Sequence, residues 1–253
     1  MKTVAVIPVV NEENTILNIA RETKNYVDEV IVVDDGSCDN TAENARKGGA
    51  IVLLNAENKG KGYSVRKGLE KALQDGAELV VTLDGDEEHD PKDVPRFLSE
   101  LKNGSADLVV GTRFKKNKWA RSKSREIMNN FTCFFMKAAT GYRLSDTNCG
   151  FRAMTREYLS KVRLKEEGFE IDLEMILEAR KHGLQVNEVV VSKPRNYAET
   201  GFSRDHMIAM NNFFDRWIIE NHTCLNISGM NRIFLLVSSR IGLSVFQRAL
   251  RLL

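Results

Sequence analysis

Short apolar runs alternate with longer stretches of mixed polarity over the first 110 residues. The runs are rich in valine, isoleucine and leucine, as strands buried on both faces are: 4–7, 30–33, 51–54, 79–83 and 108–110. The stretches between them have the length of helices: 12–25, 40–47, 61–74 and 91–102. This succession predicts an α/β fold with a doubly wound, mainly parallel, Rossmann-like sheet. Such sheets bind ligands at the carboxyl ends of their strands, so the residues directly after each strand are the candidates for function.

The pattern becomes less regular from Lys115 onward. It still predicts two helices and one strand, over 127–139, 170–182 and 186–191. No segment with the composition of a linker precedes residue 205. We therefore expect one domain over residues 1–205, which is long enough to bury a sizeable core. The remaining residues, 206–253, lack strand signals and predict a helical tail.

Composition bears on the setting of the protein rather than on its chemistry. A net charge of +2 is too small to favour nucleic acid as a partner. The four cysteines are scattered without a CxxC pair, which argues against structural zinc and disulfides and favours the reducing cytosol. Residues 1–8 carry no cleavable apolar segment. We therefore expect a cytoplasmic protein.

Three acidic clusters follow predicted strands, at 11–13, 34–37 and 84–90. A single cluster of this kind is explained most simply as a cap for the next helix. Three clusters at one edge of one sheet bring carboxylates together, and these repel each other unless a cation lies among them. Carboxylate oxygens suit Mg²⁺ or Mn²⁺. Asp84 and Asp86 flank Gly85, whose lack of a side chain lets a diphosphate approach closely.

Basic residues complement these clusters. Residues 59–62, Lys-Gly-Lys-Gly, open a predicted helix, where backbone N–H groups and positive charge suit anions. Arg113, Arg121 and Arg125 follow the fifth strand. Any one of these cations by itself is best explained as a solvated surface residue. Together with a metal held by carboxylates, they have the charges that a nucleoside diphosphate requires.

Several motifs occur in an order that resembles a known family. The first four are VIPVVNEE at 6–13, VVDDGS at 32–37, NKGKG at 58–62 and LDGDEEHDP at 83–91. These are similar to family 2 glycosyltransferases of the GT-A fold. Three further motifs resemble the dolichyl-phosphate mannose synthase-like branch: VGTRF at 110–114, SDTNCGFRA at 145–153 and GFEIDLE at 168–174. The resemblance covers roughly residues 3–205, and a GxGxxG motif typical of Rossmann dehydrogenases does not follow the first strand.

The resemblance implies a role for each matching residue. Residues near the nucleotide sugar would be Pro8, Glu12, Val33, Asp35, Lys61, Gly85 and Arg113. The metal would be held by Asp84, Asp86 and Glu88, and the reacting centre would include Asp84, Asp86, Asp146 and Arg152. The acceptor phosphate would meet Arg121, Arg125 and Arg204.

The sequence departs from the family's pattern at three of its motifs. Val10 replaces a frequent tyrosine, which puts base stacking there in question. Glu88 stands where this branch usually has glutamine, which bears on metal preference. The late basic motif keeps Gly201 and Ser203, has Arg204 in place of lysine, and lacks its first arginine, for which Arg195 is a candidate substitute.

The family reaction implied here is a single displacement at the anomeric carbon with inversion. The donor would be a UDP-sugar such as UDP-N-acetylglucosamine or UDP-glucose, or else GDP-mannose. A sugar hydroxyl acceptor needs a general base, whereas a lipid phosphate is already anionic near neutral pH. The basic stretch over 115–125 suits a polyprenyl or dolichyl phosphate. Two alternatives are a saccharide or soluble acceptor, and a nucleotide-sugar-binding protein without catalysis.

The end of the tail, 233–253, is interrupted by Arg240, Arg248 and Arg251, so it does not read as a membrane span of about 20 apolar residues. On a helical wheel these arginines share one side and apolar residues the other. Two interpretations stand equal. The tail lies on a membrane surface, making the protein peripheral on the cytoplasmic face, or it packs on the domain or on a second subunit of a homo-oligomer.

Overall fold

A computed structural model describes residues 1–114, 123–193, 212–214 and 216. The chain divides into two compact units, Met1–Thr200 and Gly201–Leu253. The fold described below is that of the first unit. Most of the predicted tail lies outside the described residues, and so do the predictions made for its membrane and subunit contacts.

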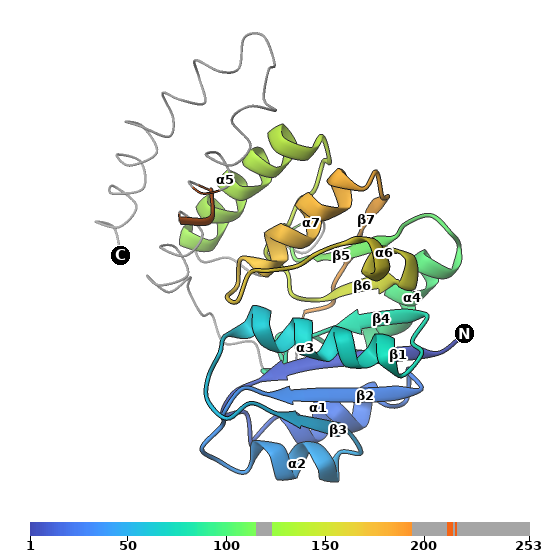
Figure 1. The fold of residues 1–253 in the computed structure, drawn as a ribbon. Coiled ribbons are helices and arrows are strands. Elements are labelled where there is room, and N and C mark those ends of the chain that lie inside the picture. The colour runs from blue at the N-terminus through green and yellow to red at the C-terminus, as the bar shows by residue number, and fades with distance from the viewer. Residues whose placement is uncertain (115–122, 194–211, 215, 217–253) are drawn as a thin grey trace. The chain divides into compact units, whose positions relative to one another are not determined.

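The described residues of the first unit form one sheet with strand order β3-β2-β1-β4-β6-β5-β7 (Figure 1). Its strands are β1 (Thr3–Val9), β2 (Glu29–Asp34), β3 (Ile51–Leu54), β4 (Leu79–Thr82), β5 (Leu108–Thr112), β6 (Arg152–Thr155) and β7 (Val186–Val190). All neighbouring pairs are parallel except those that β6 makes with β4 and β5. The predicted α/β class with a mainly parallel sheet is therefore confirmed.

Strand β6 and the helix after it are additions to the sequence prediction. The strand has only four residues, Arg-Ala-Met-Thr, and begins with a charged side chain, so it shows no apolar run. Its register places Arg152 beside Thr82 of β4 and Val110 of β5. The insertion therefore brings the segment around residues 146–152 next to the carboxyl ends of β4 and β5.

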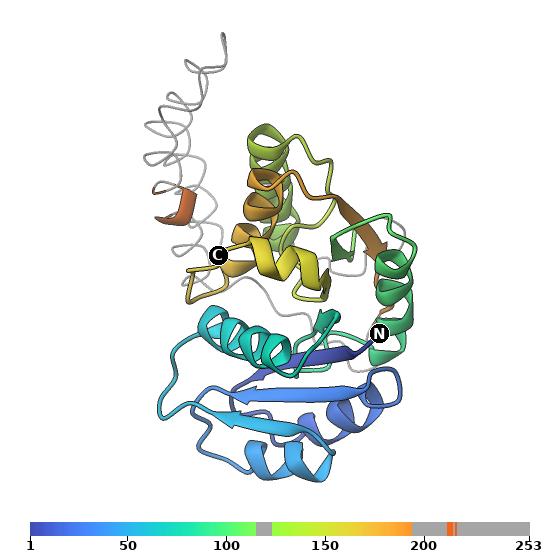
Figure 2. The same ribbon diagram turned by 45° about the vertical axis from the view of Figure 1, so that its right-hand side comes forward.

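Helices cover both faces of the sheet (Figures 1 and 2). They are α1 (Ile16–Thr23), α2 (Thr41–Lys47), α3 (Lys61–Gln74), the short 3₁₀ helix η1 (Pro91–Asp93), α4 (Val94–Lys102), α5 (Lys123–Thr140), α6 (Arg156–Lys161) and α7 (Ile171–Lys181). Helix α1 begins later than predicted, because Glu12 to Thr15 form a turn in which the Glu12 carbonyl accepts two backbone N–H groups. The first acidic cluster thus stays in a loop.

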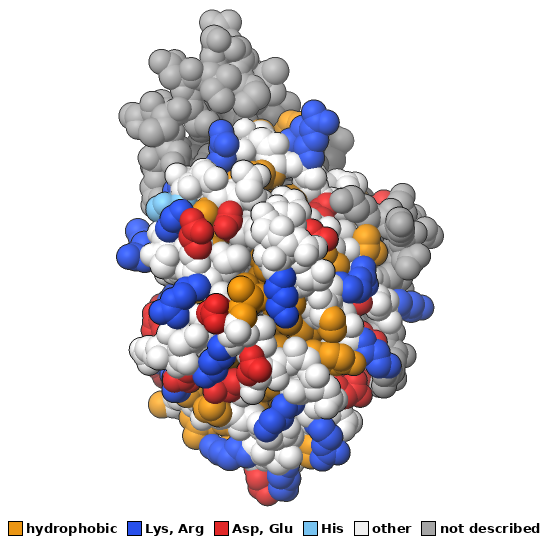
Figure 3. Space-filling view, turned by 90° about the vertical axis from the view of Figure 1, so that its right-hand side faces the viewer, with side chains coloured by type: hydrophobic (Ala, Val, Ile, Leu, Met, Phe, Trp, Pro, Cys, Tyr) orange, Lys and Arg blue, Asp and Glu red, His pale blue; other side chains and the backbone are white. Residues whose placement is uncertain are grey.

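The apolar core packs against the loop after β4 and the segment before β6. The rings of Phe97 in α4 and Phe151 stack with centroids 4.2 Å apart, and the His89 ring lies 5.2 Å from Phe151. Both phenylalanines are fully buried. The loop after β4 and the segment before β6 therefore share one apolar anchor. By contrast, basic and acidic side chains are interspersed over the face that Figure 3 shows.

Candidate active site

The loops after β1 and β2 are joined to each other at the predicted edge of the sheet. The Asn11 N–H donates to Ser37 Oγ at 2.9 Å, and the Cys38 N–H donates to Asn11 Oδ1 at 2.9 Å. Asn11 has a φ of 54°, in the left-handed region that asparagine tolerates better than most residues. The first two acidic clusters therefore meet as the strand-end rule predicts.

Asp35 organises the entry into α3. Its carboxylate accepts the N–H groups of Lys59 at 3.0 Å and Gly60 at 2.8 Å, and the Asn55 side-chain amide at 2.7 Å. The Glu167 carbonyl accepts the next N–H groups, from Gly62 and Tyr63. These backbone donors of α3, which the sequence suggested for an anion, are thus bonded within the protein. The segment presents the side chain of Lys61 instead.

Lys61 and Asp84 form the central ion pair of the site. Lys61 Nζ lies 2.8 Å from Asp84 Oδ1 and 3.7 Å from Asp172 Oδ2. A Cβ atom on Gly150 would lie 2.5 Å from Asp84 Oδ2 and 2.6 Å from Lys61 Nζ, closer than real Cβ contacts. The glycine before Phe151 is therefore needed for this pair to form where it does.

Electrostatics at this pair favour the charged forms of both partners. Burial opposes the charge of Lys61, but Asp172 and Asp84 outweigh it and raise the pKa of the ammonium. Burial likewise disfavours ionised Asp84, but Lys61 in particular outweighs it and lowers the pKa of Asp84 to about 2. Asp84 is therefore ionised and already neutralised by a lysine at neutral pH.

His89 supports Asp84 as a neutral group. Its Nδ1 accepts the backbone N–H of Asp84 at 3.1 Å, and burial lowers the pKa of the imidazole. An Nδ1 that accepts a hydrogen bond carries no proton, so the 3.7 Å approach of Nδ1 to Asp84 Oδ2 is not an ion pair. His89 thus fixes the backbone of the acidic loop without adding charge.

Asp86 differs from Asp84 because no lysine or arginine among the described residues lies within ion-pair distance of it. Asp86 is exposed at the rim of the site. Its pKa is nevertheless raised to about 7, because packing around the loop disfavours its charge and Asp84 and Glu88 repel it. Glu87, between Asp86 and Glu88, has a φ of 64°, which is a strained backbone conformation for a residue with a side chain. This loop therefore holds excess negative charge that a cation would relieve.

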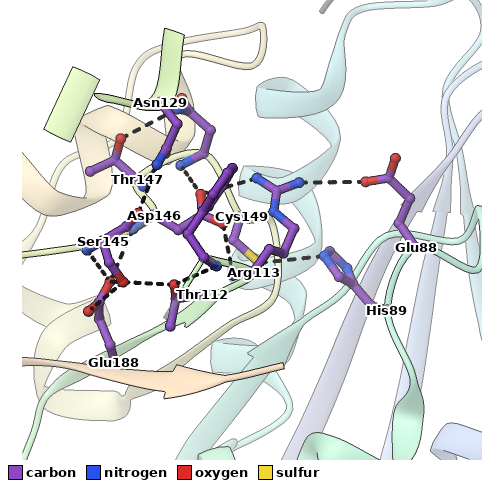
Figure 4. A network of polar contacts seen from close by, with 12 residues as sticks. Glu88, His89, Thr112, Arg113, Asn129, Ser145, Asp146, Thr147, Cys149 and Glu188 are labelled. Carbon is purple, nitrogen blue, oxygen red and sulfur yellow. Dashed lines mark hydrogen bonds and ion pairs between the residues drawn. The ribbon is translucent and has the colours of Figure 1, made fainter. Parts of the chain in front are cut away.

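Arg113 joins the acidic loop to the segment before β6 (Figure 4). Its guanidinium makes a two-pronged contact with the fully buried Asp146, with distances of 2.8 and 3.1 Å. A third nitrogen, Nη1, lies 3.6 Å from Glu88 Oε2. The structure thus brings together three residues that the sequence assigned to the site from separate motifs.

Arg152 also lies at the centre, but inside the protein. Its side chain is fully buried and donates to the carbonyls of Cys149 at 3.0 Å and Thr147 at 2.8 Å. Its Nε is 3.2 Å from Asp172 Oδ1. Asp172, at the start of α7, therefore bridges Arg152 and Lys61. Arg152 acts on the site by holding this carboxylate and the loop before β6.

The remaining donor-side residues come from the first two strands. Pro8 and Val33 are register partners in β1 and β2, and the Val33 side chain is fully buried. Glu12 accepts the Thr15 hydroxyl at 2.9 Å, and burial raises the pKa of its carboxyl. Gly85 lies where a Cβ would overlap Val9, so the sheet itself requires this glycine.

Three basic residues predicted for the acceptor phosphate are not placed by this structure. Arg121 and Arg204 lie outside the described residues. Arg125 lies in the described backbone of α5, but its side chain is not described. Their roles stay predictions.

The described residues fit a divalent metal ion whose coordination is completed by substrate phosphates and water. They contain no group of three or more His, Cys, Asp or Glu side chains arranged to hold a metal alone. Mg²⁺ typically takes one or two carboxylates together with waters and substrate phosphates, so a smaller protein contribution suffices. Asp86 and Glu88 bring two carboxylates to one loop, where the Glu88 N–H donates to Asp86 Oδ1 at 2.9 Å, and carboxylate oxygens of this kind suit Mg²⁺ or Mn²⁺.

Two functional contacts escaped the sequence prediction. Asp172 was part of a quoted motif but had no assigned role, and its position between Lys61 and Arg152 depends on how α3, α7 and β6 pack. Glu188 binds the loop that carries Asp146. The one available signal was a carboxylate within an otherwise largely apolar strand, a residue type rarely buried without a partner.

Comparison with known proteins gives a family match over most of this unit. The sequence model described as "Glycosyl transferase family 2" matches residues 4–163. The UDP-N-acetylglucosamine--dolichyl-phosphate N-acetylglucosaminyltransferase of Methanococcus voltae is 30% identical over 208 residues, 74% of this chain and 83% of that protein. The dodecaprenyl-phosphate galacturonate synthase of Rhizobium johnstonii is 32% identical over 174 residues, 64% of this chain and 50% of that one.

A solved structure is similar in fold. The glucosyl-3-phosphoglycerate synthase of Mycobacterium tuberculosis, in complex with Mn²⁺, UDP and phosphoglyceric acid, matches with a TM-score of 0.61 and 22% identity. The match covers 78% of this chain and 72% of that chain. Since sequence identity is low, the likeness concerns the arrangement of strands and helices.

We expect Lys61 and Asp84 to show a large coupling energy in the free energy of unfolding. Lys61→Met should lower the free energy of unfolding by about 3 kcal/mol, because removing one partner leaves a buried charge uncompensated. Asp84→Asn should also destabilise, but the double variant should lose less than the sum of both. Urea unfolding of the four proteins at pH 7 measures the coupling. Additive losses would contradict the pair, and Lys71→Met, at a surface pair of the same helix, is the control.

Removing the charge of Asp86 should raise the free energy of unfolding, by an amount that depends on pH. In EDTA, Asp86→Asn should match the wild type near pH 4 and exceed its stability at pH 8. The unfolded pKa is near 3.8 and the folded pKa about 7, so ionisation disfavours the folded state increasingly between these values. Solvent screening limits the gain to about 1 kcal/mol.

Urea unfolding at pH 4, 6 and 8 gives this comparison. Asp90→Asn, in the same loop, keeps the cap of η1 and serves as the control, with no such gain at pH 8 expected. A gain for Asp86→Asn that is equal at all three pH values would contradict the repulsion described for this loop.

Proposed function

We propose, from the premise that this chain belongs to glycosyl transferase family 2, that it moves a sugar from a nucleoside diphosphate sugar to a polyprenyl phosphate. Membership of the family rests on the match over residues 4–163, and it confirms the resemblance found in the sequence. Two relatives whose names specify dolichyl-phosphate and dodecaprenyl-phosphate support the acceptor class. The observation in this chain that carries the proposal is the Lys61–Asp84 pair beside Asp86.

On the donor side, the chain supplies charge and positioning. Lys61 neutralises Asp84, so that the acidic loop is less repulsive toward an incoming diphosphate. Asp86, together with Glu88, would hold Mg²⁺ or Mn²⁺. When bound, that ion neutralises charge on the departing diphosphate. Arg113, fixed by Asp146 and close to Glu88, adds a cation with a set direction at the same loop.

On the acceptor side, the arrangement suits a nucleophile that needs no general base. Asp84, Asp146 and Asp172 each pair with a lysine or arginine, so their carboxylate oxygens are already engaged in ion pairs. A lipid phosphate is anionic near neutral pH and needs cations for positioning. The basic residues over 115–125 are the candidates for this task.

A second candidate is transfer to a sugar hydroxyl, and one observation favours it. The pKa of Asp86 is raised to about 7, which is the range of an effective general base at neutral pH. This use of Asp86 would compete with its use as a metal ligand. The two candidates therefore differ in the role of Asp86, which holds the metal in the first and accepts a proton from the acceptor hydroxyl in the second.

A membrane surface is the corresponding partner of the proposed reaction, and the protein would act peripherally on the cytoplasmic face. Helix α5 exposes Ile127, Phe131 and Phe134, to 55%, 40% and 67%, at a spacing that lines one side of a helix. Such a stripe, which follows the basic residues over 115–125 in the sequence, suits a lipid interface. Among the described residues, no helix is long and apolar enough to cross a bilayer.

The proposal predicts which donors and acceptors turn over. The full chain should transfer sugar from UDP-N-acetylglucosamine, UDP-glucose or GDP-mannose to a short polyprenyl phosphate, with Mn²⁺ or Mg²⁺ present. Asp86→Ala should lower transfer at least about 100-fold, as expected when a metal ligand is lost. Asp90→Asn should stay within about twofold, because it keeps the cap of η1. Product formation followed by mass spectrometry is the measurement.

Three outcomes would count against the proposal. Transfer to soluble saccharides but not to the lipid phosphate would favour the hydroxyl acceptor. Donor binding without turnover of any acceptor would favour a binding protein. Full activity of Asp86→Ala in EDTA would remove the metal site from this loop.

A further inference from the structure

Glu188 lies in β7, a strand at the end of the sheet, where its register partner in β5 is Val110. Its carboxylate accepts the N–H of Ser145 at 2.6 Å and the N–H of Asp146 at 3.2 Å. Both of its oxygens lie 3.1 Å from the Ser145 hydroxyl. One side chain therefore binds two successive backbone N–H groups of the loop that carries Asp146.

The same loop is held from two other elements (Figure 4). The hydroxyl oxygens of Thr112 in β5 and Ser145 are 2.8 Å apart. The Asn129 side chain in α5 donates to the Ser145 carbonyl at 2.8 Å. The carbonyl of the Ser145–Asp146 peptide is thus fixed by α5 and its N–H by β7, which leaves this peptide little freedom to rotate.

Arg113 takes its direction from this loop. Asp146 accepts both the guanidinium of Arg113, at 2.8 and 3.1 Å, and its backbone N–H at 3.2 Å. The other end of the guanidinium approaches Glu88 in the acidic loop, at 3.6 Å. Any shift of the Ser145–Asp146 peptide would therefore move the Asp146 carboxylate and, with it, the cation that faces the acidic loop.

We propose that Glu188 is a positioning residue for sugar transfer, acting through the Ser145–Asp146 peptide to aim Arg113 at the loop of Asp84 and Asp86. The inference rests on the proposed function for the reaction it serves. The role requires the length of the glutamate side chain, since its Oε1 must reach the N–H groups of both Ser145 and Asp146. It adds to the site a residue about which the family motifs say nothing.

Two substitutions separate length from charge. Glu188→Gln keeps the length, and its amide oxygen can still accept the two N–H groups. Glu188→Asp keeps the charge but withdraws the oxygens by about 1.5 Å, one carbon–carbon bond. Asn187→Ala is the matched control, because this neighbour in β7 bonds to Glu100 instead. The variants are compared as full chains in the donor and acceptor screen with Mn²⁺.

We expect kcat of Glu188→Asp to fall about 10- to 100-fold, since misplacement by about 1 Å has effects of this size. The KM for the donor should stay within about twofold. Glu188→Gln should keep kcat within about threefold of the wild type, and Asn187→Ala should be unchanged. Loss of activity in Glu188→Gln equal to that in Glu188→Asp would overturn the positioning role, as would wild-type kcat in Glu188→Asp.

Amide hydrogen exchange over residues 144–152 provides a readout that needs no turnover. Exchange there should be faster in Glu188→Asp than in the wild type, and unchanged in Glu188→Gln and Asn187→Ala. Unchanged exchange in Glu188→Asp would overturn the inference. If the wild type uses no polyprenyl phosphate, the proposed function fails, and the Glu188 inference is then decided by this exchange and by donor hydrolysis.

Discussion

A lysine held between two carboxylates is the interaction on which the arrangement of the site depends. Lys61 reaches Asp84 at 2.8 Å and Asp172 at 3.7 Å, and these residues come from α3, the loop after β4 and the start of α7. Without this cation, two carboxylates would approach each other with little solvent between them. Lys61 therefore allows the loop after β4 and the start of α7 to lie close together.

Glycines near the Lys61–Asp84 pair lie where neighbouring atoms leave no room for a side chain. Side chains on Gly60 or Gly62 would overlap the carbonyls of Glu166 and Glu167, and one on Gly150 would displace Asp84 and Lys61. The Glu167 carbonyl in turn accepts the first N–H groups of α3. The glycines that look like a phosphate-binding loop in the sequence thus serve to seat α3 against the segment before α7.

The strand-end rule predicted from the sequence that several candidate residues lie close together, because parallel strands bring their carboxyl ends to one edge of the sheet. The structure places Lys61 beside Asp84 and Arg113 beside Glu88 at that edge, and their functional roles stay predictions. The rule did not find β6, because this antiparallel strand has only four residues, Arg-Ala-Met-Thr, and they form no apolar run. The roles of Asp172 and Glu188 depend on that insertion and on packing between distant segments, which spacing along the chain does not encode.

The central claim is that a lipid phosphate attacks the anomeric carbon of the donor sugar. Identification of both products from one reaction tests it most directly, with UDP-N-acetylglucosamine, a short polyprenyl phosphate, Mn²⁺ and the full chain. The same products are sought with UDP-glucose or GDP-mannose if that donor is the one consumed. Attack at the anomeric carbon should yield a nucleoside diphosphate and a polyprenyl monophosphate sugar in equal amounts. A nucleoside monophosphate together with a polyprenyl diphosphate sugar would contradict it, since attack would then have occurred at phosphorus.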